Sequence, residues 1–342
     1  MKSWPGYTHG INLGGWLSQC VHTEEHYECF IREEDFQTIR SWGLDHVRVP
    51  IDYNLVEDEN GAYRESGFAR IQNAIDWSRR NGLNLVLDLH KTYGFSFDAQ
   101  EGEHGFFESE SCQERFYRLW EELARRFARY QDTLAFELLN EVTEREYGPV
   151  WNRIAAQCIA RIRAIAPEIS IPVGSYWHNS LAALPDLLPP PDEHIIYNFH
   201  CYEPIIFTHQ GAYWMPPMST AFRIPLSSRY GELAAAALEQ LGEPSRDLAG
   251  LDPEARFSPD FFRRRFADAV KLAEERGVPL YCGEYGVIDC ATPEDTLRWY
   301  AAIHEAFEAF GIGRAAWSFR QMDFGLSDAR LDGVRGQLLP LL

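Results

Sequence analysis

Two glutamates stand where apolar segments of the sequence end. Glu141 closes the segment 136–141 (Phe-Glu-Leu-Leu-Asn-Glu), and Glu284 follows the segment 279–282 (Pro-Leu-Tyr-Cys) by one glycine. A carboxylate at the end of a buried strand lies in a partly dry cleft, where acid/base and nucleophilic chemistry is usually done. Two such carboxylates suggest hydrolysis of a glycosidic bond, because that reaction uses a pair of carboxyl groups that flank the bond.

Other polar and aromatic side chains also follow apolar segments, at the places where strands would end. Any one of them alone is more often a structural hydrogen-bonding group than a functional one. Together they would carry a large desolvation cost unless they contact one another or a ligand. They are therefore candidate site residues: Arg48, His90, Asn140, His200, Tyr202 and Trp317.

The elements that would position these residues alternate along the chain. Short apolar strands are predicted at 10–13, 45–49, 83–87, 133–139, 168–173, 195–199, 278–282 and 313–317. Amphipathic helices are predicted at 33–41, 68–81, 112–130, 149–166, 261–276 and 293–310, with weaker signals near 179–183 and 331–341. Alternating β and α elements predict a parallel sheet, and eight repeats predict an α/β fold of the (β/α)8 TIM barrel type.

One connection, at 203–258, is far longer than the roughly 2–6 residues that usually follow a barrel strand. It begins with an aromatic and proline-rich stretch around Trp214 and contains a helix signal at 232–241 that ends at Gly242. We predict a single catalytic domain over 1–342, in which this insertion after the sixth strand forms a lid or subdomain that covers the cleft. The alternative is a packing appendage with no role at the ligand.

The composition limits the class of partner. Lys+Arg 32 against Asp+Glu 51 give a net charge of −19, and an acidic surface repels nucleic acid and anionic lipid. No apolar run approaches the ~18 residues that a membrane span needs. We therefore expect a neutral substrate, no nucleic-acid partner, no membrane partner and a monomer.

The cysteines and the start of the chain indicate in which cellular compartment the protein is expected. Cys 7 is an odd count, and no Cys-x-x-Cys pair occurs, which favours reduced, buried thiols. The first predicted strand begins too early to leave room for a leader. We expect a cytoplasmic protein, or a secreted one whose leader is absent from this sequence.

No cofactor or metal is implied by the sequence patterns. The segment 311–316 (Gly-Ile-Gly-Arg-Ala-Ala) precedes a strand instead of following one, so it is not a dinucleotide loop. No His-Glu-x-x-His string occurs. The acidic segment 101–110 could mimic a calcium site, but a solvated loop that borders the cleft is the better interpretation.

The six candidates and the two glutamates together resemble the site of glycoside hydrolase family 5, the cellulase family, in their order and in their placement on the strands. Segments 10–16, 46–50, 85–90 and 197–200 add further similarity, so the resemblance spans essentially the whole chain. The chain resembles clostridial endoglucanases with a large insertion after the sixth strand, and this resemblance implies cleavage of β-1,4-glucosidic bonds in cellulose-type or mixed-linkage β-glucans. Val142 stands where the family often has proline, which bears on loop geometry and not on activity.

The resemblance implies distinct roles for the two glutamates in a retaining, double-displacement mechanism. Glu284 is the nucleophile, and Glu141 is the acid/base. Arg48 and Tyr202 would hold Glu284 ionised and aimed. Glu141 would start protonated, because the neighbouring negative charge raises its pKa, and it would ionise more readily once Glu284 is esterified.

The other residues would bind the sugar. Asn140 would donate to the 2-hydroxyl, His90 and His200 would bind hydroxyls or orient the glutamates, and Trp317 would lie beneath the reacting ring. Neighbouring subsites have further candidates, for each of which simple packing is the alternative: Trp16, Phe107, Trp177, His178 and Trp214.

Several alternatives to an endo-β-glucanase stay open. A mannanase, a xylanase or an exo-acting β-glucosidase would use the same barrel and mechanism with a different pocket. A transglycosylase would share the covalent intermediate and differ only in the acceptor. A non-catalytic carbohydrate-binding protein would normally have lost one of the glutamates, and both are present.

Overall fold

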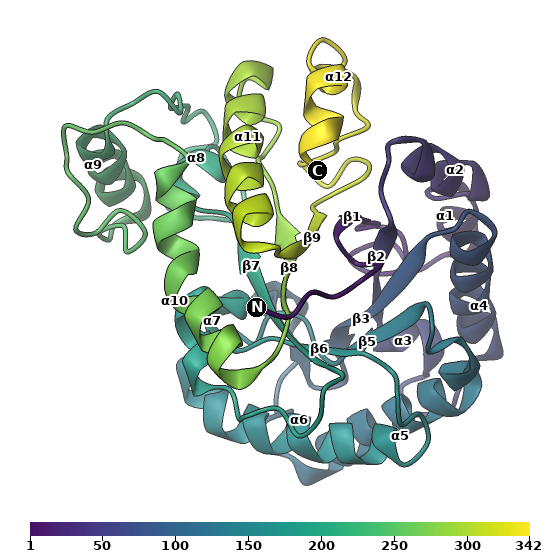
Figure 1. Ribbon diagram of the computed structural model, residues 1–342. Helices are drawn as coiled ribbons and strands as arrows, with labels where there is room; N and C mark the ends of the chain where they lie inside the picture. The colour runs from purple at the N-terminus through teal and green to yellow at the C-terminus, as the bar shows by residue number, and fades with distance from the viewer.

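The computed structural model describes residues 1–342, apart from the side chain of Ala99. Its centre is a ring of parallel strands (Figure 1): β1 (His9–Asn12), β2 (His46–Asp52), β3 (Asn84–Thr92), β5 (Leu134–Glu137), β6 (Ile171–Val173), β7 (Ile195–Cys201), β8 (Leu280–Tyr285) and β9 (Gly313–Ala316). β5 pairs with β3, and a bridge between Ala135 and Ser170 joins β5 to the segment before β6, which closes the ring. The predicted TIM barrel is confirmed.

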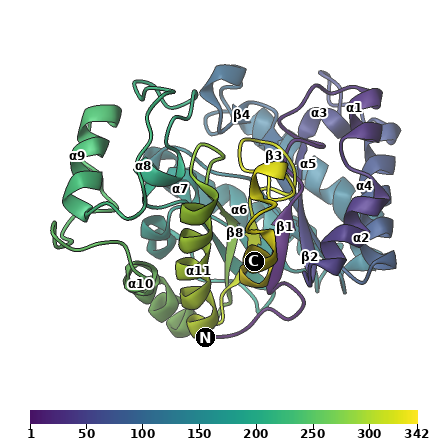
Figure 2. The same cartoon turned by 90° about the horizontal axis from the view of Figure 1, so that it is seen from above.

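Helices surround this ring on the outside (Figures 1 and 2). They are α1 (Glu24–Cys29), α2 (Glu33–Ser41), α3 (Tyr53–Val56), α4 (Glu65–Arg80), α5 (Glu110–Phe127), α6 (Gly148–Arg163), α7 (Tyr176–Asn179), α8 (Ile205–Thr208), α9 (Tyr230–Leu241), α10 (Asp260–Arg276), α11 (Pro293–Phe310) and α12 (Arg335–Leu338). Among the described residues, none of these helices is long and apolar enough to span a membrane.

Helix α11 illustrates why the long helices have the predicted bounds. The Thr292 side chain accepts a hydrogen bond from the backbone N–H of Asp295, and Pro293 occupies the first turn. Gly311 then ends the helix at a φ of +66°, a conformation that glycine adopts without a steric penalty. These signals are all local in sequence, so α11 matches its prediction at both ends, as α2 does.

Four strands, β2, β3, β7 and β8, continue past their predicted ends, and this changes where the site residues lie. The pairing of β2 with β3 continues from Val49 and Leu87 to Asp52 and Lys91, so Arg48 lies in the middle of β2 and not at its end. β3 also runs past His90 and turns back into a short antiparallel strand, β4 (Phe95–Ser96). The apolar segment used to predict β3 stops at Leu87 because the next residue, Asp88, is charged and buried.

The two weak helix predictions are wrong in detail. At 179–183 the chain forms a left-handed turn followed by a 3-10 helix over Leu181–Asp186. At 331–341 only α12 is α-helical, and 3-10 turns flank it at Ala329–Leu331 and Leu339–Leu341.

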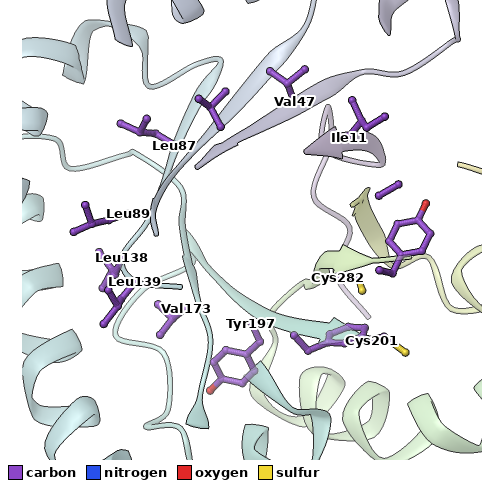
Figure 3. Packing of buried hydrophobic residues seen from close by; sticks show 14 of the residues in the cluster. Ile11, Val47, Leu87, Leu89, Leu138, Leu139, Val173, Tyr197, Cys201 and Cys282 are labelled. Carbon is purple, nitrogen blue, oxygen red and sulfur yellow. The ribbon is translucent and has the colours of Figure 1, made fainter. Parts of the chain in front are cut away.

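Side chains on the strands alternate between the helices and the barrel interior. Val47, Leu87 and Tyr197 point outward to the helices (Figure 3). The alternate positions form a second apolar cluster inside the barrel, with Trp4 and Tyr7 from the N-terminal segment stacked at a centroid distance of 3.9 Å. Above this cluster the interior becomes polar, which is where the candidate site lies.

Candidate active site

Glu284 lies in β8 and has different partners on its two oxygens. The Arg48 guanidinium donates to Oε1 at 2.7 Å, and the Tyr202 hydroxyl donates to Oε2 at 2.8 Å. A cation and a hydroxyl donor both stabilise the ionised form of a buried carboxylate. These are the contacts that the sequence predicts for a carboxylate that must stay charged.

Arg48 is fully buried and ties the site to the barrel interior. Its Nε and Nη2 donate to the two oxygens of Glu137 at 2.7 and 2.8 Å, and Nη2 lies 3.0 Å from Asp88. The guanidinium also donates to Oδ1 of Asn12 and of Asn140, each at 2.9 Å. Burial alone would lower the pKa of Arg48, but the surrounding carboxylates raise it well above its ordinary value, so the residue remains a cation.

Sequence reasoning missed Glu137 and Asp88, although both are fully buried and pair with Arg48. Burial raises the pKa of Glu137 more than Arg48 lowers it, so its net shift is upward. A signal was present in the sequence: both residues are acidic positions inside otherwise apolar strands, and the ladder places them directly opposite each other. An acidic residue at such an interior position must have a partner in the fold.

Glu141 follows β5 at a backbone φ of +38° and contacts two imidazoles. His200 Nδ1 lies 2.6 Å from Oε1, and His178 Nδ1 lies 3.0 Å from Oε2. Burial raises the pKa of Glu141, but the hydrogen bonds from His178 and His200 lower it well below its ordinary value. The prediction of a raised pKa is therefore wrong for this structure, because it considered the charge of Glu284 and not the two imidazoles.

The two carboxylates are close together. One oxygen of Glu141, one oxygen of Glu284 and a ring nitrogen of His200 all lie within 4.8 Å of one another. Such a group could geometrically surround a cation, but the positive charge of Arg48, 2.7 Å from Glu284, opposes a second cation there. The arrangement is a carboxylate pair supported by an arginine and imidazoles, and the expectation of no metal stays a prediction.

Trp317 follows β9 and forms a wall of the site with His90. The two rings stack with centroids 5.8 Å apart and an interplanar angle of 7°. His90 Nδ1 lies 2.6 Å from Asp88; burial lowers the pKa of His90, but Asp88 raises it more. A Cβ on Gly14 would come within 2.6 Å of the Trp317 ring, so the close approach of the chain to this ring requires glycine.

The three predicted subsite tryptophans have different surroundings. Trp16 is 1% exposed, donates from Nε1 to the Tyr27 carbonyl and stacks on Trp77, so the prediction that it lines a subsite is wrong. Sequence could not separate it from a cleft residue because it lies only four positions after β1. Trp177 and Trp214 are partly buried, and their roles as subsites stay predictions.

A cavity of about 500 Å³ adjoins Glu141 on the side of His178. The β3–β4 hairpin and the following acidic segment form much of its wall, including Phe97, Glu103, His104 and Glu108, and Glu144 completes the opposite side. The predicted acidic loop thus borders the site. Its carboxylates make this cavity unfavourable for anionic groups.

Part of the insertion reaches the site. Trp214 and Met215 pack on a cluster that contains Trp317 and Phe324, and Arg246 lies over the Trp177 ring at 5.4 Å. α9 instead lies at the outer edge of the molecule, beyond α8 (Figure 1). The role of the whole insertion as a cover for the cleft stays a prediction.

Comparison with known proteins shows to which family the chain belongs. The sequence model of the cellulase family, glycosyl hydrolase family 5, matches residues 8–323. The chain belongs to glycoside hydrolase family 5. It is accordingly a cellulase-like glycoside hydrolase.

Relatives within family 5 extend over nearly the whole chain. Cellodextrinase A of Ruminococcus flavefaciens is 44% identical over 90% of this chain and 84% of its own length. Endoglucanase C of Acetivibrio thermocellus is 34% identical over 97% of both chains. The solved structure of a hyperthermophilic endo-beta-1,4-glucanase in complex with substrate has a TM-score of 0.78 at 24% identity, covering 98% of this chain and 97% of that one, and supports the fold.

Proposed function

We propose that the protein is a retaining endo-β-glucanase that hydrolyses β-1,4-glucosidic bonds in cellulose-type or mixed-linkage β-glucans. The observation that carries the proposal is the spacing of Glu141 and Glu284, which have oxygens within 4.8 Å of each other. Retaining enzymes hold their carboxyl groups about 5–5.5 Å apart, whereas inverting enzymes need about 6.5–9.5 Å to admit a water molecule. The observed spacing fits direct attack by one carboxylate.

In the first step Glu284 attacks the anomeric carbon and Glu141 protonates the departing glycosidic oxygen. Arg48 and Tyr202 fix the orientation of the Glu284 oxygens by their contacts at 2.7 and 2.8 Å. The C–O bond to the leaving sugar breaks as the bond to Glu284 forms.

In the second step Glu141 takes a proton from water, which attacks the anomeric carbon and releases Glu284. Loss of the Glu284 charge on esterification removes a repulsion from the site, so the electrostatic environment differs between the two steps. Asn140 would bind the sugar 2-hydroxyl, with His90, His200 and Trp317 as further contacts to the reacting sugar.

A neutral glucan is the substrate class that the surroundings favour. The cavity beside Glu141 is bordered by Glu103, Glu108 and Glu144, so a chain bearing carboxylates would meet like charges. We expect barley β-glucan and cello-oligosaccharides to be better substrates than carboxymethylcellulose of the same chain length.

Action on short soluble chains is the second candidate. It is favoured by the relative with 44% identity, which is named a cellodextrinase, against 34% for the endoglucanase. Product lengths from barley β-glucan, carboxymethylcellulose, laminarin, glucomannan, mannan and xylan separate the two functions and test the other sugars. Endo action releases mixed oligosaccharides early, whereas cellodextrinase action leaves polymer viscosity nearly unchanged.

The catalytic assignments are tested with Glu284→Ala and Glu141→Ala. Each should lose most turnover while the far-UV circular dichroism is retained. Azide should rescue Glu284→Ala on an aryl β-cellobioside with an inverted glycosyl azide, because the anion enters on the face that the nucleophile has vacated. Full activity in either variant would remove the assignment.

A further inference from the structure

Three consecutive residues near Glu141 adopt a left-handed backbone. Trp177, His178 and Asn179 have φ values of +52°, +56° and +55°, and none of them is glycine. Left-handed conformations cost roughly 1–2 kcal/mol per residue for non-glycine residues, so the surrounding structure must impose this turn. It does so through the backbone: the N–H groups of Trp177 and His178 donate to the carbonyls of Thr143 and Val142 at 3.0 Å each.

The turn helps to position both imidazoles that contact Glu141. It contains one of them, His178, and its last residue, Asn179, contacts the other, His200. His178 itself lies with Nδ1 3.0 Å from Oε2 of Glu141. Asn179 Nδ2 lies 3.3 Å from Nε2 of His200, whose Nδ1 contacts the other oxygen of the same carboxylate. A backbone strained at this point therefore has the specific effect of holding two imidazoles on one carboxylate.

The two imidazoles differ in their access to solvent. The His178 side chain is 54% exposed, whereas that of His200 is 2% exposed. The proton on His178 can therefore exchange with water, whereas Glu141 itself is only 9% exposed. Burial lowers the pKa of His178, but its hydrogen bond to Glu141 raises it above the ordinary value, and the Glu141 pKa shifts in the opposite direction.

Other charged groups also face this pair. Negative charges on Glu144 and Glu284 raise the pKa of His178 further. His209 is buried, which lowers its pKa to about 4 and keeps it neutral. The remaining charged or titratable groups border the same cavity or lie over the neighbouring Trp177 ring: Glu103, His104, Glu108, Arg145, Tyr147 and Arg246.

We propose that His178 is a positioning residue that holds the acid/base proton of Glu141 between its two uses. In the free enzyme the pair carries one proton, on Nδ1 of His178, and Glu141 is a carboxylate. For the first step the proton moves from Nδ1 to Oε2 of Glu141 and then to the leaving oxygen, so the imidazole becomes neutral. In the second step the proton taken from water passes from Glu141 back to Nδ1, and the pair is restored. The inference rests on the proposed function of Glu141.

The first test measures the proton directly and needs no substrate. NMR titration of the imidazole C–H signals should give His178 a pKa above 6.5 in the wild type, with the signal assigned by its absence in His178→Gln. In Glu141→Gln the His178 pKa should fall by about one unit or more, because a carboxylate in contact shifts a partner by roughly 1–3 units. An equal His178 pKa in both proteins would overturn the proposal, even if the glucanase activity is absent.

The second test uses the pH dependence of kcat/KM on a cello-oligosaccharide. His178→Gln keeps a hydrogen-bond donor but cannot carry the proton, so the alkaline limb should move to lower pH by about one unit or more, which is a loss of about fivefold or more at the wild-type midpoint. His194→Gln, just before β7 at the opposite end of the barrel, is the matched control and should not move the limb. An alkaline limb that is unchanged, or that moves upward, in His178→Gln would contradict the proton-holding role.

A dinitrophenyl β-cellobioside separates this role from a merely structural one. Its leaving group departs without a proton, so glycosylation of Glu284 should be nearly equal in the wild type and in His178→Gln. An equally large loss on both substrates would mean that the substitution disrupts the site, and would reject the role in proton transfer. Absence of turnover on both substrates in the wild type would instead reject the proposed function.

Discussion

Replacement of Arg48 by lysine should strongly destabilise the fold although the charge is kept. Three nitrogens of Arg48 donate to Glu137 twice, to Glu284, to Asn12 and to Asn140, over distances of 2.7 to 2.9 Å. A lysine has one nitrogen with three protons, so it can satisfy at most three of these contacts. At least two of the five contacts would be lost. Three different nitrogens of Arg48 face Asp88, Glu137 and Glu284, and one ammonium nitrogen cannot take all three places, so at least one buried carboxylate would lie farther from the cation.

The magnitude follows from that unpaired charge. Breaking a buried ion pair by removing one partner costs about 3–5 kcal/mol, which is a large share of the roughly 5–15 kcal/mol that separates most folded proteins from the unfolded state. The carboxylates of Asp88 and Glu137 are 0% and 1% exposed, and Glu284 is 7% exposed, so water cannot replace the guanidinium without opening the barrel. We therefore expect Arg48→Lys to lose about 3–5 kcal/mol of unfolding free energy.

Urea denaturation at pH 7, followed by tryptophan fluorescence, measures this loss. Arg161→Lys is the matched control, because Arg161 also donates to both oxygens of one carboxylate, Glu114, at 2.8 and 2.6 Å. That carboxylate is 49% exposed, so solvent screens the pair and the control should change little. A loss below about 1 kcal/mol in Arg48→Lys, the net value of a single ordinary hydrogen bond, would refute the reasoning.

Three further predictions concern the walls of the site. Gly14→Ala should raise KM with the fold intact. The new methyl group would lie 2.6 Å from the Trp317 ring and would displace it. An unchanged KM would contradict this contact. Tyr202→Phe should lower kcat by about 10²–10³, as loss of an oriented donor does in other active sites, and steady-state kinetics at the pH optimum would detect it. Glu141 has a folded pKa below its ordinary value of 4.5, so its ionisation stabilises the fold above that pH and this contribution is lost as pH falls through the folded pKa. The difference in urea stability between wild type and Glu141→Gln should therefore shrink below pH 4.5, and a constant difference would show that the imidazole contacts do not stabilise the carboxylate.

Much of the barrel could be predicted because its signals are local. The bounds of α11 follow from Thr292, Pro293 and Gly311, which act within one turn of each helix end. The eight candidate site residues could be named from the sequence because each follows or interrupts an apolar segment. Trp16 was misplaced for the same reason, since proximity to a strand does not reveal whether a ring faces the cleft or packs on Trp77.

The contacts that sequence could not reveal are those made across the barrel or by unusual backbone. Glu137 and Arg48 are 89 positions apart, and their pairing depends on the register of three strands. His178 reaches Glu141 only because 177–179 adopt a left-handed turn, and three non-glycine residues give no signal for that conformation. The predicted direction of the Glu141 pKa was wrong because nothing in the sequence indicates that His178 and His200 both contact this carboxylate.

The two carboxylates of the site differ in the kind of cation that accompanies them, and this difference matches what each must do. Glu284 is paired with Arg48, whose charge is fixed at any pH at which the protein is folded. Glu141 contacts two imidazoles, and that of His178 can gain or lose a proton near neutrality. A nucleophile has to remain ionised until it forms a covalent bond, so a permanent cation suits it. An acid/base has to gain and lose a proton in every cycle, so a partner that can itself hold that proton suits it. The identity of the neighbouring cation thus separates the two glutamates more directly than their own burial, which is similar at 9% and 5% exposure.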